Sequence, residues 1–175
     1  MTAKVYKKIE LAENQLKTAI ELFVSGGDKF SAITLAGAAD VILCRLVLNA
    51  GEENFTEFSL RQTDSDGDDN ETREYHGRKI NNTLFINHLK HMDDGEDGYV
   101  EMDVDGCALG TILKALANYV ILYGSEKDFV QAFLAWVRLN LNPKKYNITV
   151  ILIGSQPHNQ GLQRICYTLR VTQTR

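Results

Sequence analysis

Two histidines, a lysine and an aspartate lie close together between positions 88 and 93, and they are the strongest candidates for catalysis in this sequence. They are His88, Lys90, His91 and Asp93. An imidazole titrates near neutral pH and can transfer a proton during phosphodiester cleavage, while an ammonium group can stabilise charge on the phosphate. On a helix, positions 88 and 91 share a face, and Asp93 could orient one imidazole. The structural alternative is a helix C-terminus, where Lys90 and His91 complement the dipole and bind free carbonyl groups.

A second group of candidate residues is basic and lies towards the C-terminus. No aspartate or glutamate follows Asp128, whereas Lys144, Lys145, Arg164 and Arg170 occur there with tyrosines between them. Such side chains could follow the phosphate backbone of RNA, so we consider these four as nucleic-acid or partner-binding residues. The overall pI of about 5.6 disfavours strong non-specific binding to nucleic acid. We therefore favour pairing with an acidic segment of the same chain, or with another protein.

The acidic segment is residues 52–77, whose most polar part is 63–71. Aspartates at 64, 66 and 68 occupy the first, third and fifth positions of an EF-hand calcium loop. Asp69 replaces the glycine of the sixth position, and Tyr75 replaces the glutamate of the twelfth. The bend and the bidentate ligand are both missing, so we expect a solvated loop and no metal site.

No pattern typical of a bound cofactor occurs in the sequence. The run 25–28 lacks the preceding strand and the glycine spacing of a phosphate-binding loop. Cys44, Cys107 and Cys166 are widely separated, so neither zinc nor a disulfide framework is expected. The apolar stretch 33–48 is interrupted by two charged residues, and the N-terminus lacks a signal-peptide pattern. We therefore expect a cytoplasmic protein with reduced thiols, no cofactor and no contact with a membrane.

Apolar residues that recur every three or four positions predict the helices that would hold these candidates in place. A serine- and glycine-rich stop separates the first two helices, and Asp28 or Ser31 can cap the second. This second helix is apolar nearly all round and has small residues at 36–39, so we interpret it as the central helix of a bundle. A capping box of Ser125 and Asp128 would begin the last helix. The predicted helices cover residues 3–24, 29–49, 78–92, 105–124 and 125–143.

The C-terminal segment has a different pattern. Residues 147–153 are rich in β-branched side chains, and residues 162–172 alternate between apolar and polar, which is typical of strands. The segment between them would connect them as a β-hairpin. We therefore predict a mainly α protein: an up-and-down bundle of about five helices over residues 1–143, with a basic β-hairpin extension over residues 144–175 packed on it. Apolar helix faces or hairpin edges would form a homodimer.

Five segments follow one another in an order and spacing that match a known helical family. They are Ala12-Glu13-Asn14-Gln15-Leu16-Lys17-Thr18-Ala19-Ile20-Glu21-Leu22-Phe23, then Gly27-Asp28 with Ser31, Leu35-Ala36 to Ala39 with Ile42-Leu43, Asn87-His88-Leu89-Lys90-His91-Met92-Asp93, and Ala132-Phe133 to Trp136. The fourth is similar to an Asn-x-x-Lys-His-Ala-Asp signature. Together these segments resemble the HEPN-type helical bundle of a group of largely uncharacterised bacterial proteins. The resemblance covers about residues 8–142 and implies a HEPN-like fold.

HEPN ribonucleases carry an arginine followed, after four to six intervening residues, by a histidine, and this pair handles the scissile phosphate. Here Arg73 is too near His76, and Arg78 is too far from His88. The resemblance therefore supports the fold more than catalysis. Our leading hypothesis is a non-enzymatic binding or interaction module that contacts RNA or a protein partner through its basic extension. The alternative is a divergent metal-independent endoribonuclease, or a toxin-like protein of a bacterial defence or toxin–antitoxin system, that uses the cluster at 88–93.

Overall fold

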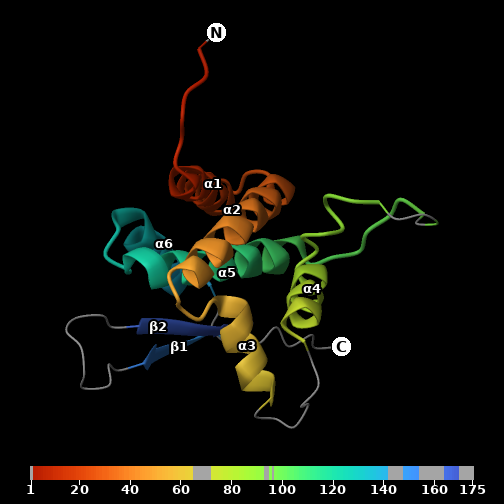
Figure 1. Cartoon of the computed structure of the whole chain (residues 1–175). Helices are drawn as coiled ribbons and strands as arrows, with labels where there is room; N and C mark the ends of the chain where they lie inside the picture. Colours follow the sequence, from red (N-terminus) through yellow and green to blue (C-terminus); the bar gives the residue numbers. More distant parts are fainter. Residues whose placement is uncertain are drawn as a thin grey trace.

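The computed structural model describes the backbone of residues 2–64, 72–92, 95, 97–141, 148–153 and 164–169, and side chains up to residue 141 except those of 63 and 64. This part of the chain contains six helices and is mainly helical, as predicted (Figure 1). The helices are α1 (Lys8–Val24), α2 (Lys29–Asn49), α3 (Phe55–Asp64), α4 (Arg73–Thr83), α5 (Val104–Tyr123) and α6 (Asp128–Asn140).

Two short strands follow the helices in the described backbone. They are β1 (Ile148–Ile153) and β2 (Arg164–Leu169), and they pair antiparallel. Their side chains, the segment that connects them, and Lys144, Lys145 and Arg170 lie outside the described residues. The predicted basic extension packed on the bundle therefore stays a prediction.

The central helix of the bundle is α5. Figure 1 shows it running through the middle of the fold, with α1 and α2 on one side and α3 on the other. Every residue from Cys107 to Val120 is buried. The prediction that α2 is central is wrong, because 78% of the apolar stretch of α5 is buried but only 44% of that of α2. The reason is that α2 packs against α1 and α5 but keeps an exposed side that includes Val41 and Arg45.

The helices α2 and α5 are long and apolar enough to cross a membrane by length and composition alone. Both also supply the core of the bundle, where Ala36 and Leu43 of α2 and Ile112 and Leu116 of α5 are fully buried. Apolarity of this kind is equally a property of core helices in soluble bundles.

A helix, α3, occupies part of the segment 52–77 that the sequence predicts to be a loop, so that prediction is wrong here. The side chain of Asn54 accepts a hydrogen bond from the backbone N–H of Glu57, and the side chain of Glu57 accepts one from the N–H of Asn54, both at 3.1 Å. The first N–H of the helix donates to the Asn118 side chain of α5 at 2.9 Å. The helix thus begins at a contact between distant segments, which its short and weakly periodic sequence does not reveal. Residues 65–71 lie outside the described residues.

The next helix, α4, begins and ends earlier than the predicted span of 78–92. Thr72 caps its start, because its side chain accepts a backbone N–H of the first turn at 3.3 Å. The helix ends before Phe85, which has a positive φ of 57°. This turn lets Ile86 pack on α2 at Gly37, where a Cβ would lie only 2.8 Å from the Ile86 Cγ2. A continuous helix to position 92 is thus replaced by turns that bury Ile86, which is 3% exposed.

The ends of three helices test the predicted caps. Asp28 caps α2 as expected, since its side chain accepts from the N–H groups of the first turn at 3.0 and 3.2 Å. The predicted capping box at Ser125 is wrong, because α6 begins after Lys127, and it is the carbonyl of Ser125 that accepts from Gln131 at 2.6 Å. Residues 3–7, predicted to be helical, precede α1 and are exposed.

Candidate functional site

The predicted catalytic cluster lies on an exposed stretch of turns after the end of α4. His88, Lys90 and His91 are all exposed, and Asp93 lies outside the described residues. The ring of His88 lies 5.3 Å from that of Phe85, measured between centroids. Because this segment is not helical, the common helical face expected for positions 88 and 91 is not formed. A catalytic role for the cluster stays a prediction.

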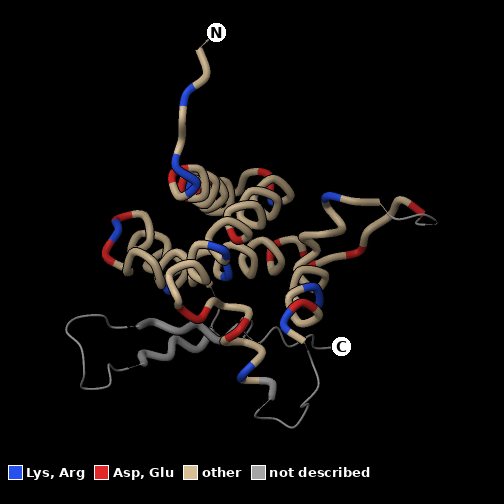
Figure 2. The backbone as a smooth tube through the Cα atoms, viewed as in Figure 1, with Lys and Arg blue, Asp and Glu red and all other residues tan. Residues whose placement is uncertain are grey.

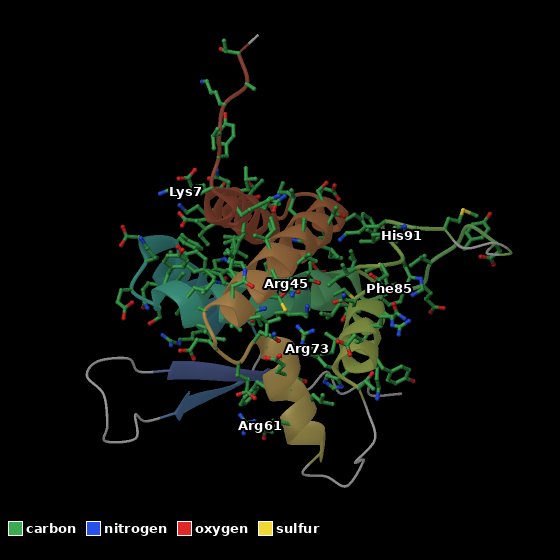
Figure 3. All side chains as sticks on the ribbon, in the orientation of Figure 1. Lys7, Arg45, Arg61, Arg73, Phe85 and His91 are labelled. Carbon is green, nitrogen blue, oxygen red and sulfur yellow. The ribbon has the colours of Figure 1, made fainter. Side chains whose placement is uncertain are left out.

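His91 is also separated from three of the arginines that could complete a HEPN-type pair. In Figure 3 it lies on the outer side of the turn after α4, whereas Arg45 and Arg73 lie together near the middle of the fold and Arg61 lies at the far end of α3. None of these three guanidinium groups is near the His91 imidazole.

An arginine and a histidine do lie one turn apart on α4, at Arg73 and His76. The His76 side chain is 6% exposed, and its Nε2 lies 3.1 Å from the hydroxyl of Ser59 on α3. The Arg73 Nε lies 3.2 Å from a carboxylate oxygen of Glu57, also on α3. Both side chains of the pair therefore connect α4 to α3.

A buried polar network, absent from the predicted site, joins α2 to α5. The Lys114 ammonium donates to the carboxylate of Asp40, and these side chains are only 4% and 6% exposed. The Asn118 side chain donates to the second oxygen of Asp40 at 2.9 Å. Lys114 and Asn118 lie on one face of α5 because they are four residues apart. Asp40 is therefore fully paired inside the apolar core.

The network continues to the other two helices on this side of the bundle. The side-chain amide oxygen of Asn118 accepts a hydrogen bond from the first N–H of α3, at Phe55. Arg73 of α4 contacts Glu57 of α3, and its Nη2 donates to the sulfur of Cys44 on α2 at 3.6 Å. Four helices thus meet through polar side chains at one junction.

A cavity of about 560 Å³ opens beside this junction. Its polar wall includes Asp40, Arg45, Arg73, Asn81 and Lys114, and its apolar wall includes residues of α2. The cavity volume lies within the range of small-molecule sites, about 300–1,000 Å³. The described lining of the cavity contains no histidine.

The thiol of Cys44 also lines the cavity, but its surroundings do not activate it as a nucleophile. Burial raises its pKa above the ordinary value, and the nearby Asp40 carboxylate raises it further. A thiol, unlike a thiolate, is a weak nucleophile. Burial raises the pKa of Cys107 in the same way. Both cysteines are free, and Cys166 has its side chain outside the described residues.

The basic candidates of the C-terminal segment cannot be placed in this site. The side chains of Lys144, Lys145, Arg164 and Arg170 lie outside the described residues. On the described helices, Figure 2 shows lysines and arginines interspersed with acids rather than gathered on one face. Groups of three or more histidine, cysteine or acidic side chains that could hold a metal ion are also absent from this described part.

The sequence does indicate one part of the buried polar network, the pair of Asp40 and Lys114. Asp40 is an acid within the apolar helix α2, and Lys114 is a base in the middle of the apolar helix α5. Charged side chains are almost never buried without a partner, so an acid and a base in two core helices are expected to pair. Arg73 and the contacts of α3 have no such signal, because the neighbouring sequence predicts a loop, and nothing in the predicted helix 78–92 distinguishes Asn81.

No protein-family model, curated protein or solved structure matches this chain. The function is therefore inferred from the contacts of its own residues.

Proposed function

We propose that this chain is a non-enzymatic binding module, a HEPN-like bundle that contacts RNA or a protein partner through a basic hairpin extension. The contacting residues in this proposal are Lys144, Lys145, Arg164 and Arg170. One observation carries it: the titratable groups enclosed at the helix junction are already paired with one another. Lys114 pairs with Asp40, and Arg73 pairs with Glu57.

This pairing argues for binding rather than catalysis, because a general base needs a free lone pair and a position beside its substrate. The Lys114 ammonium donates a hydrogen bond to the Asp40 carboxylate, so it is not free to contact a substrate. His91 does not lie beside Arg45 or Arg73 at the cavity (Figure 3), and His76 is buried against Ser59.

The HEPN-like fold of the proposal has support from the arrangement of the helices. The helices α1 and α2 pack on each other and on α5, and the aromatic residues Phe133 and Trp136 of α6 pack on Phe23 of α1. For the extension, the support is the antiparallel pairing of β1 and β2 in a segment that is rich in basic residues.

We further propose a cytoplasmic, homodimeric protein without membrane contact. The two most apolar helices contact each other, and Asp40 of α2 pairs with Lys114 of α5 between them. This arrangement suits a soluble bundle, in which apolar helix faces are covered by other helices. Exposed apolar side chains such as Tyr99 and Leu139 offer surface for a second copy.

The test is to incubate the full chain with labelled single-stranded and structured RNA in EDTA. We expect intact RNA and salt-dependent binding, which Lys144→Ala combined with Arg170→Ala weakens. Arg61→Ala, which removes an exposed arginine of α3 that pairs with Glu53, serves as the matched control and should bind normally.

Cleavage in EDTA that His91→Ala abolishes would overturn the proposal in favour of the endoribonuclease. Absence of both binding and cleavage would assign the extension to a protein partner. Light scattering then measures whether the chain is a dimer.

A further inference from the structure

Two of the side chains that line the cavity at the helix junction each contain a buried polar atom without a hydrogen bond. The Nε of Arg73 and the Oδ1 of Asn81 are both buried without a hydrogen bond, although both side chains line the cavity. Glu57 lies 3.2 Å from the Arg73 Nε, but not in the direction of a hydrogen bond. A buried polar atom without a hydrogen bond is unfavourable, so a molecule that supplies an acceptor to Arg73 and a donor to Asn81 is favoured there.

The charge of the lining favours an anion. The Asp40 carboxylate is neutralised by Lys114, and Asn118 occupies its other oxygen. The Glu74 carboxylate, also in the lining, lies 3.8 Å from Arg73 and is itself exposed. Arg73 is balanced by its ion pair with Glu57, whereas Arg45 forms no ion pair with any of the described acids and adds a positive charge at the cavity.

The shape and the remaining wall favour an anion attached to an apolar body. Val41, Leu46 and Leu48 contribute to the lining alongside Arg45. A volume of about 560 Å³ is much larger than a phosphate ion needs. Apolar contact combined with a few fixed polar groups is typical of sites for small organic ligands.

We propose that this cavity binds a small organic oxyanion, a carboxylate or a phosphate monoester on an apolar body, with its anionic group at Arg45 and Arg73. Guanidinium groups suit both the carboxylate and the phosphate because two of their N–H groups can donate to two oxygen atoms of the same anion. The apolar body lies along the α2 wall, and Asn81 accepts a hydrogen bond from a ligand hydroxyl or N–H. This site goes beyond the proposed function, which concerns the C-terminal extension.

The experiment is a nuclear magnetic resonance titration of the isotope-labelled full chain with phenyl phosphate, with benzoate and with neutral benzamide. We expect saturable shifts in the amide signals of residues 41–48 and 73–81 with at least one of the two anions, and binding about tenfold weaker or more for benzamide. The two anions distinguish a phosphate-ester site from a carboxylate site.

Arg45→Gln should weaken anion binding about tenfold, because it removes an exposed guanidinium without touching the core. Arg61→Gln, outside the cavity lining, is the matched control and should leave the affinity unchanged. Equal affinity for benzamide, shifts that do not saturate, or full affinity in Arg45→Gln would each overturn the site. The RNA experiment changes other residues, so failure of either proposal is recognised separately.

Discussion

Asp40 of α2 and Lys114 of α5 form an ion pair inside the bundle although 74 residues separate them in the sequence. Their side chains are 6% and 4% exposed, so neither charge is solvated by water. A charge in this position is tolerated only with its partner, and the pair therefore fixes how the two most apolar helices pack.

Removing one member of this pair should destabilise the fold strongly. Lys114→Met leaves a carboxylate buried with only Asn118 as its partner, and we expect a loss of about 3–5 kcal/mol in the free energy of unfolding. Lys17→Met is the control, since Lys17 pairs with Glu13 at the surface and should contribute about 1 kcal/mol or less. Urea unfolding followed by circular dichroism measures both.

The double variant Asp40→Leu with Lys114→Met sharpens this prediction. Because it removes both charges, it should recover part of the stability that Lys114→Met loses. A double variant less stable than the single variant would contradict the view that the unpaired charge causes the loss.

A methyl group at Gly37 should destabilise the contact between α2 and the turn after α4. The Cβ of Gly37→Ala would lie 2.8 Å from the Ile86 Cγ2, which is closer than such atoms approach. We expect a loss of about 1 kcal/mol or more despite the better helix propensity of alanine. Gly77→Ala on α4 is the matched control, since its Cβ would meet Thr56 at 3.4 Å and should leave stability unchanged or raise it. Equal effects at both positions would refute the close packing at Ile86.

The stability should fall in acid through Glu13. The hydrogen bond from Lys17 lowers the pKa of this carboxyl below its usual 4.5, and the hydroxyl of Tyr119 lowers it further, while burial acts in the opposite direction. A lowered folded pKa means that the fold favours the carboxylate, so its contribution is complete above the unfolded pKa and is lost as pH falls through the folded pKa. The advantage of the natural chain over Glu13→Gln should therefore shrink below about pH 4.5. Unfolding curves between pH 7 and pH 3 measure it, and a constant difference would exclude this role.

Substitution of Asp28 and of Ser125, both of which the sequence predicts to cap helices, should affect stability differently. Asp28→Ala removes a side chain that accepts two N–H groups at the start of α2, and we expect a loss of about 1 kcal/mol. Ser125→Ala should change stability little, because the helix begins after Lys127 and the side chain of Ser125 caps nothing in it. Thermal unfolding compares them, and a substantial loss in Ser125→Ala would restore the sequence-based boundary.

The local sequence determined the parts of the fold that depend on neighbouring residues. The apolar periodicity and the Asp28 cap located α2, and a similar pattern with Gly124 located α5, because helix start and stop signals act within a few residues. The acid of α2 and the base of α5 were visible as well, and the rule that buried charges pair connects Asp40 to Lys114.

Only the tertiary structure decided the elements whose stability comes from distant segments. The first N–H of α3 is satisfied by Asn118, and α4 stops where it does because Ile86 reaches Gly37. These contacts assemble the cavity, in which Arg45 of one helix and Arg73 of another line a common wall. Hydrogen bonds and close packing between residues far apart in the chain leave no periodic trace in either segment, so local pattern could not predict them.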